Sequence, residues 1–148
     1  MGDSSVPSAI DRIIDAVDRL IPSYSSNPAD ASAGGNLALC ILDGAGGVRG
    51  KIWGKDKVRG RHYFRLAWTK ASQVWITGMK TGEYEKKLFN GEFDEGLYGI
   101  QKPDLIGWEG GQPVRLADGT VLSIGFSGFR GVSDLEIVLR AVAEIEKV

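Results

Sequence analysis

The segment that decides the fold reads Leu37-Ala38-Leu39-Cys40-Ile41-Leu42-Asp43-Gly44-Ala45-Gly46-Gly47. It opens as an apolar run of strand length and ends in a glycine-rich turn, and a second strand-like run, 48–54, follows directly. Two such runs joined by a glycine-rich turn are typical of a β-hairpin. We therefore predict two antiparallel strands, 36–43 and 48–54.

These glycines do not form a phosphate-binding loop. That loop has the pattern Gly-x-x-x-x-Gly-Lys-Ser/Thr, whereas Ile52 follows Gly50-Lys51 here and Ala45 stands at the first glycine position. Arg49 occupies the place of the third glycine of the dinucleotide-binding motif. Both motifs also require a following helix, whose N-terminus holds the anion, and this sequence continues as a strand.

A second hairpin is predicted nearer the C-terminus. The segments 113–116 and 121–127 are largely apolar, and Asp118-Gly119 lies between them. Asp-Gly between two apolar runs is a strong signal for a tight hairpin turn. The two hairpins can join into one antiparallel sheet with helices packed on it.

Four helices are predicted around the hairpins, over 9–21, over 61–78, from Thr81 to Phe89, and from Ser133 onward. Apolar residues recur there every three or four positions, as on one face of a helix. The order α-β-β-α-α-β-β-α indicates an α+β fold, in which an antiparallel sheet from two hairpins is flanked by helices. We expect a single domain over 1–148, with 1–35 as an N-terminal helix and loop.

Polar residues mark the expected ends of these helices. Ser8 can cap the first helix, and Pro22 is expected to stop it. Thr81 can cap the third helix. Ser133 and Glu136 have the spacing of a capping box at the start of the last helix.

The composition is that of an ordinary globular protein. Of 148 residues, 43% are apolar and 25% are charged, and the net charge of -1 gives no overall field that attracts nucleic acid or an anionic membrane. No apolar stretch approaches the roughly 20 residues that span a bilayer, and residues 1–6 lack the pattern of a secretory signal. We expect a cytoplasmic protein that binds neither nucleic acid nor membranes, with Cys40 as a buried apolar residue.

A basic run provides the first candidate ligand-binding residues. It consists of Lys51, Lys55, Lys57, Arg59, Arg61 and Arg65. It is either a solvated face or a site for a carboxylate or phosphate of a small ligand, for which Arg61 and Arg65 are the candidates.

His62 is the only histidine, so a site with two histidine ligands is excluded and no metal site built from side chains is expected. His62 is either an exposed residue or a haem ligand or acid–base group.

Lys70 borders the apolar stripe of the helix 61–78. That stripe consists of Phe64, Ala67, Trp68, Ala71, Val74, Trp75 and Gly78. Lys70 is either a flank residue whose amine reaches solvent, or a group in a cleft that acts as base, imine-forming amine or anion anchor. Glu83 and Asp134 lie in the first turns of helices, where acidic side chains stabilise the helix. They are also candidate acid–base groups.

Several segments together resemble a known family. In order, they are Leu37 to Gly47, Lys70-Ala71-Ser72 with Gly78-Met79-x-Thr81-x-Glu83, Gly99-Ile100, Trp108-x-Gly110-Gly111-x-Pro113-Val114, Val121 to Gly128, and Asp134. Over about residues 36 to 148 the chain is similar to the GlcG/HbpS-like family of haem-binding or haem-degrading-type domains. Gln73 stands where the family has a threonine, and the start of the last helix also differs.

The resemblance implies a profilin-like α+β sandwich, a homo-oligomer, and a pocket near the Lys70 helix and the Gly-Gly-Pro segment. Its implied ligand-binding residues are Trp108, Gly110, Gly111 and Pro113. Haem is the cofactor that it implies, and no other cofactor is expected.

Three functions follow as hypotheses. The first is a small-ligand pocket that binds haem or a similar tetrapyrrole. The second is a cofactor-independent isomerase, cyclase or lyase that acts on a small organic acid or aromatic metabolite, with Lys70, Glu83, Asp134 and His62 as candidate catalytic residues. The third is an interaction module of the profilin or sensor type. In the first two, the glycine-rich loop 90–111 is a candidate lid.

Overall fold

The computed structural model describes residues 6–101 and 104–146. Its elements are α1 (Val6–Ser25), a short 3-10 helix η1 (Ala31–Ala33), β1 (Leu37–Leu42), β2 (Val48–Trp53), α2 (Lys57–Thr77), α3 (Thr81–Phe89), β3 (Gly111–Arg115), β4 (Val121–Ser127) and α4 (Gly131–Ile145). The α+β class and the predicted order of helices and strands are confirmed.

The two predicted hairpins form one antiparallel sheet. In the described part of the chain the strand order is β2-β1-β4-β3. β1 pairs with β2 in the first hairpin, and β3 pairs with β4 in the second. β1 and β4 join the hairpins, with Leu39 opposite Phe126 and Cys40 opposite Gly125.

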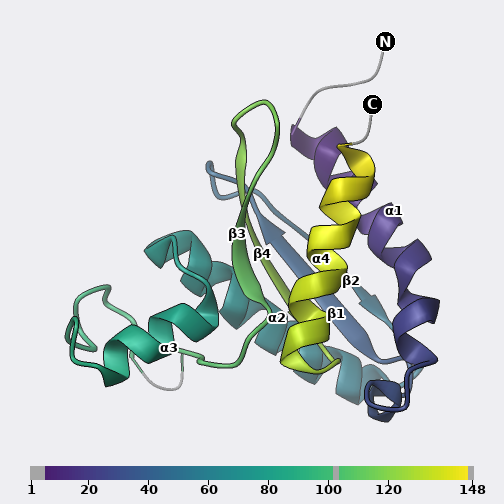
Figure 1. Cartoon of the computed structure of the whole chain (residues 1–148), viewed down its shortest axis with the longest axis horizontal. Coiled ribbons are helices and arrows are strands. Elements are labelled where there is room, and N and C mark those ends of the chain that lie inside the picture. The colour runs from purple at the N-terminus through teal and green to yellow at the C-terminus, as the bar shows by residue number, and fades with distance from the viewer. Residues whose placement is uncertain (1–5, 102–103, 147–148) are drawn as a thin grey trace.

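Helices cover both faces of the sheet (Figure 1). α1 and α4 lie side by side on one face, where large residues of β1 and β4 form the main core with them. These residues are Leu37, Leu39, Ile41, Leu122, Ile124 and Phe126. α2 covers the other face, where the alternate residues of the strands are small.

Small residues let α2 lie very close to the sheet. Cys40, Gly125 and Gly111 are paired across β1, β4 and β3, so they share the face that α2 covers. A Cβ added at Gly125 would lie 2.2 Å from the Ala67 backbone oxygen on α2. The helix backbone therefore rests on the strand backbone at this point, and the site described below lies beside it.

The first helix is longer than predicted. α1 runs from Val6 to Ser25, so Ser8 lies within the helix and not before its start as predicted. Pro22 does not stop the helix either but lies within it. Proline costs one hydrogen bond to the preceding turn, and buried residues on both sides, from Ile10 to Tyr24, hold the helix in place.

The long helix α2 buries a different flank from the one predicted. It begins four residues earlier than expected, because the Asp56 carboxylate caps it by accepting hydrogen bonds from two backbone N–H groups. Trp68 and Trp75 are exposed, whereas Lys70 and Gln73 are buried. The close contact between the helix and the sheet has no room for indole rings, so the side of α2 that carries Ala67 and Ala71 faces the sheet.

Two predicted caps are also wrong. The residue before α3 is Lys80, and Thr81 is the first residue of the helix. α4 begins at Gly131, so Ser133 lies inside its first turn, and the Ser133 hydroxyl donates to Asp30. The capping box with Glu136 does not form, since Glu136 accepts a hydrogen bond from Tyr24.

Within the described ranges, no helix is both long enough and apolar enough to cross a membrane.

Candidate functional site

A buried lysine–carboxylate pair lies where α2, β4 and α4 meet. Lys70 Nζ is 3.5 Å from Asp134 Oδ2, and each side chain is only 3% exposed. Lys70 Nζ donates a hydrogen bond to the Phe126 carbonyl oxygen at 2.8 Å. Asp134 Oδ1 accepts one from the Phe129 backbone N–H at 3.0 Å. The structure thus brings together two of the candidate catalytic residues and buries both side chains almost completely.

Glycines make room for the pair. Gly110 has φ of +125°, and an added Cβ would lie 2.5 Å from the Phe126 oxygen and 2.7 Å from Lys70 Nζ. An added Cβ at Gly111 would lie 3.1 Å from the Lys70 Cβ. Both glycines are buried, so they shape the site by closing the backbone over Lys70.

Burial shifts both members of the pair toward their uncharged forms. Desolvation lowers the pKa of Lys70, although the nearby Asp134 carboxylate partly opposes the change. Desolvation likewise raises the pKa of Asp134 to about 8, although Lys70 and the Phe129 N–H oppose it. Because both shifts move the pKa values toward neutral pH, the pair is suited to exchange protons with a ligand.

The pair forms part of the wall of an open cleft of about 590 Å³. Sites for small ligands typically have volumes of about 300–1,000 Å³. The cleft is lined by His62, Tyr63, Leu66, Lys70, Trp108, Glu109, Ser127, Gly128, Phe129, Arg130, Gly131, Val132 and Asp134. It lies between α2, the loop that precedes β3, and the turn from β4 into α4.

His62 and Trp108 are the other sequence-based candidates at this cleft. His62 is exposed on the second turn of α2, and its ring lies 5.6 Å from the ring of Tyr63. Trp108 is 67% exposed and belongs to the loop before β3. The cleft therefore combines one imidazole, one indole ring and the buried pair.

The remaining candidates lie elsewhere. Glu83 forms an ion pair with Lys87 on α3 and lines a different hollow. Arg61 is exposed on α2 and does not line the cleft. Arg65 lines a neighbouring hollow, which shares Leu66 and Trp108 with the cleft. Pro113 is half-buried in β3, opposite Ser123.

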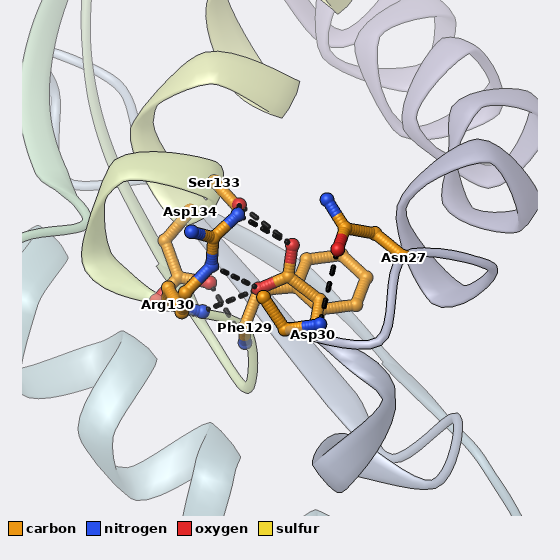
Figure 2. A network of polar contacts seen from close by, with 7 residues as sticks. Asn27, Asp30, Phe129, Arg130, Ser133 and Asp134 are labelled. Carbon is orange, nitrogen blue, oxygen red and sulfur yellow. Dashed lines mark hydrogen bonds and ion pairs between the residues drawn. The ribbon is translucent and has the colours of Figure 1, made fainter.

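Arg130 and Asp30 belong to the site and were missed in the sequence. Figure 2 shows Asp30, from the loop after α1, facing the start of α4. The Asp30 carboxylate is fully buried and accepts hydrogen bonds from Arg130 N at 2.9 Å, Arg130 Nε at 3.2 Å and the Ser133 hydroxyl at 2.8 Å. Burial by itself would raise the pKa of Asp30, but these hydrogen bonds outweigh it and the pKa is lowered.

This network fixes the turn that carries Arg130 into the cleft. The Arg130 side chain is 49% exposed and lines the cleft, while Asp30 holds its guanidinium group in position. The sequence contains one local signal for this turn, since Gly128-Phe129-Arg130-Gly131 joins a strand directly to a helix. Nothing in the sequence pairs it with Asp30.

Buried side chains on α2 and α3 hold the segment that carries Trp108. Gln73 accepts a hydrogen bond from the Ile106 N–H and donates one to the Ile106 oxygen, both at 2.8 Å. The Thr81 hydroxyl donates to the Trp108 oxygen at 2.6 Å and accepts from the Gly111 N–H at 3.2 Å. The two side chains therefore attach the described segment 104–111 to the helices beside the cleft.

Comparison with known proteins finds relatives by structure. No family model and no curated protein matches the chain. HbpS aligns with 100% of this chain and 93% of its own, with a TM-score of 0.66 at 20% identity, and a double mutant of Streptomyces reticuli HbpS gives the same score and identity. Protein ORFY of Klebsiella pneumoniae, from family DUF336, aligns over 100% of this chain and 99% of its own, with a TM-score of 0.68 at 17% identity.

A fourth match is a complex of PduOC with haem. It covers 96% of this chain and 94% of its own, with a TM-score of 0.63 at 18% identity. The resemblance found in the sequence is thus confirmed in three dimensions: the chain has the fold that HbpS, ORFY and PduOC share.

Proposed function

We propose that the cleft beside Lys70 and Asp134 binds a small ligand with a flat apolar body and a carboxylate, and that haem is the candidate ligand. The observation that carries the proposal is the cleft itself. Its wall combines aromatic side chains, the half-exposed side chain of Arg130 and the only histidine of the chain. The structural likeness to the PduOC–haem complex supports the same ligand.

Apolar groups from three parts of the chain line the cleft and suit a flat apolar ligand. Tyr63 and Leu66 come from α2, Trp108 from the loop before β3, and Val132 from the start of α4. Aromatic and aliphatic side chains of this kind supply most of the binding free energy in small-ligand sites.

The start of α4 suits the carboxylate. Arg130 precedes the helix, and Gly131 and Val132 in its first turn also line the cleft. First-turn N–H groups lack partners within the helix, and the helix dipole favours a negative charge at that end. Arg130 adds a guanidinium group, which binds carboxylates with two parallel hydrogen bonds.

The residues present fit haem. His62 lines the cleft, and its imidazole makes no hydrogen bond to another described residue, so it is available as an axial ligand. Arg130 would hold a propionate, and Trp108 would lie against the ring system. Bound haem supplies an iron centre that can bind small molecules or exchange electrons.

A haemin titration followed by visible spectroscopy tests the proposal. We expect a Soret band that saturates at a fixed haem-to-chain ratio and is lost in His62→Ala. Trp108→Ala, within the cleft, is expected to weaken binding. Trp75→Ala removes an exposed indole outside the cleft and is the matched control, with unchanged binding expected. A band that rises without saturation, or that Trp75→Ala reduces as much as Trp108→Ala, would indicate adsorption to exposed aromatics and contradict the proposal.

A second candidate function is cofactor-independent acid–base catalysis on a small organic acid or aromatic metabolite. The observation that favours it is the burial of Lys70 and Asp134 at 3.5 Å in the wall of a cleft. Such a pair can remove a proton from a carbon next to a carbonyl group and return it at another atom. Exchange of the α-protons of small oxo acids with deuterated water, followed by NMR, tests it. We expect exchange that Asp134→Asn slows about 100-fold, and exchange equal to that of buffer would remove this candidate.

Two further statements from the sequence stay proposals. A homo-oligomer is supported by the large apolar side chains exposed on α2 and β2, among them Trp68, Trp75 and Ile52. The second of these proposals is a cytoplasmic location. Fractionation of the cells that produce the protein, followed by its detection in each fraction, tests it.

A further inference from the structure

We propose that Lys70 is a nucleophile that forms an imine with a carbonyl group of the ligand, and that Asp134 supplies the proton for the loss of water. The inference rests on the second candidate function and names its substrate class, a small aldehyde or ketone that also carries a carboxylate. A 2-oxo acid is the simplest member of that class.

Lys70 has the environment that a nucleophilic amine requires. It is the one buried lysine among residues 6–101 and 104–146, yet its side chain forms part of the wall of an open cleft. An amine attacks a carbonyl carbon only as the free base, and desolvation lowers the pKa of Lys70 and so favours that form. The hydrogen bond to the Phe126 oxygen fixes the position of Nζ.

Asp134 has the environment of a proton donor. Oδ1 accepts from the Phe129 N–H, while Oδ2 faces Lys70 Nζ. Burial raises the pKa of Asp134 to about 8, so the group carries a proton near neutral pH. An amine whose free base is favoured by burial, 3.5 Å from a carboxyl group whose protonated form is favoured by burial, is the combination that imine formation uses.

The reaction balances without a further reagent. The Nζ lone pair attacks the carbonyl carbon, and the oxygen takes up the proton that the nitrogen loses, which gives a carbinolamine. Asp134 then donates its proton to the hydroxyl group, which leaves as water while the nitrogen lone pair forms the C=N bond. The remaining proton on nitrogen returns to the Asp134 carboxylate. One amine and one carbonyl group give one imine and one water.

The start of α4 favours a carboxylate on the same ligand. Arg130, Gly131 and Val132 line the cleft together with Lys70 and Asp134, so a carboxylate held at the start of α4 lies in the same cleft as the amine. Trp108 and Leu66 also line the cleft, so they can contact an apolar substituent on that ligand. The predicted ligand therefore carries its carbonyl group close to its carboxylate.

Reductive trapping tests the inference on the intact chain. The protein is incubated at pH 7 with glyoxylate or pyruvate and sodium cyanoborohydride, and the modified lysine is located by peptide mapping with mass spectrometry. We expect modification of Lys70 ahead of the exposed lysines, which are protonated at this pH. We also expect Asp134→Asn to slow trapping about 100-fold, Lys70→Met to abolish it, and Lys57→Arg, on the exposed start of α2, to leave it unchanged. Acetaldehyde, which lacks a carboxylate, is expected to label Lys70 more slowly than glyoxylate.

Each outcome decides the inference. Wild-type protein in which exposed lysines are modified and Lys70 is not overturns it, and this result needs no variant that could misfold. If the α-protons exchange but no lysine is trapped, imine formation is overturned and acid–base catalysis is still supported. Absence of both exchange and trapping overturns the second candidate function as well. Trapping at Lys70 that Asp134→Asn does not slow overturns the role assigned to Asp134.

Discussion

Gly110 and Asp134 show how single residues create the candidate site. The positive φ of Gly110 and the absence of its side chain let the backbone lie directly over Lys70 Nζ. The start of α4 then places the Asp134 carboxylate on the same amine. From the sequence alone, Gly110 is an ordinary turn glycine and Asp134 is an ordinary acidic residue in the first turn of a helix. Their part in the candidate site comes from their contacts with Lys70.

Gly110→Ala is expected to lower the free energy of unfolding by about 3 kcal/mol or more, because the strained φ adds to overpacking against Phe126 and Lys70. Gly119→Ala is the control. Its φ of +91° is also positive, but nothing lies within 4 Å of an added Cβ, so a loss of only about 1 kcal/mol is expected. Urea unfolding of both variants measures the difference, and equal losses would mean that packing over Lys70 adds nothing.

The titration of Asp134 is expected to appear in the pH dependence of stability. Its pKa is raised from 3.8 to about 8, so between these values the folded state holds a proton that the unfolded chain has lost. Stability from this group is therefore complete below about pH 4 and is lost as the pH rises toward 8. The lowered pKa of Lys70 acts in the opposite direction, with stability rising toward pH 10.5.

Lys70→Met separates the two effects by removing the amine. We expect this variant to lose up to about 1.4 kcal/mol per pH unit between pH 5 and 8 relative to the double variant Lys70→Met/Asp134→Asn. Urea unfolding at several pH values checks it. Parallel curves for the two variants would show that the pKa of Asp134 is not raised in the folded protein.

At the scale of elements, the position of the segment 104–111 depends on α2 and α3. Gln73 pairs with both backbone groups of Ile106, and Thr81 bridges Trp108 and Gly111. The sequence assigns Thr81 to a helix cap and leaves Gln73 without a role, because neither partner is close in the chain. Trp108 lines the cleft only because these two helices hold the segment 104–111 in place.

Gln73→Ala leaves the N–H and oxygen of Ile106 without partners in a buried place, which is expected to cost about 2–3 kcal/mol. Hydrogen exchange at 104–111 is expected to accelerate, and ligand binding that depends on Trp108 is expected to weaken. Ser72→Ala is the matched control, since the Ser72 hydroxyl bonds only to the backbone of its own helix, and a change within about 0.5 kcal/mol is expected. Unchanged exchange in Gln73→Ala would show that the segment is held by other contacts.

At the scale of the whole molecule, α2 has two different outer surfaces. One flank forms the cleft with Trp108 and Arg130. The other exposes Trp68 and Trp75 near the edge strand β2, where Ile52 is 48% exposed. An added Cβ at Gly46 would lie 3.8 Å from the Trp75 ring, so this indole lies against the β1–β2 turn. Exposed apolar surfaces of this kind are typical of contacts between subunits.

Sedimentation velocity is expected to show a species larger than the 15.9 kDa chain. Trp75→Glu is expected to shift it toward the monomer, because a charge disfavours burial in an apolar contact. Phe89→Glu at the end of α3, where Phe89 is 78% exposed, is the control and is expected to have no effect. A monomeric wild-type protein at high concentration would contradict the homo-oligomer.

The sequence by itself determined the secondary structure and the class of fold. The apolar run from Leu37 and the Asp118-Gly119 turn are local signals, and strands and tight turns form from neighbouring residues. Helix ends were less accurate where tertiary contacts intervene, as at Pro22, which the core keeps inside α1. Lys70, Asp134, His62 and Trp108 were candidates from the sequence, but their grouping was not visible there.

Only the tertiary structure decided which side of α2 is buried and which residues from other elements contact that side. A helical stripe has two edges, and its periodicity does not say which edge faces the sheet. Here Cys40, Gly125 and Gly111 leave space for a close helix backbone, so Lys70 and Gln73 turn inward and Trp68 and Trp75 turn outward. The pairing of Lys70 with Asp134, and of Arg130 with Asp30, joins segments distant in the chain. Packing creates those pairs, because a buried polar group is stable only with a partner, and folding is what brings these partners together.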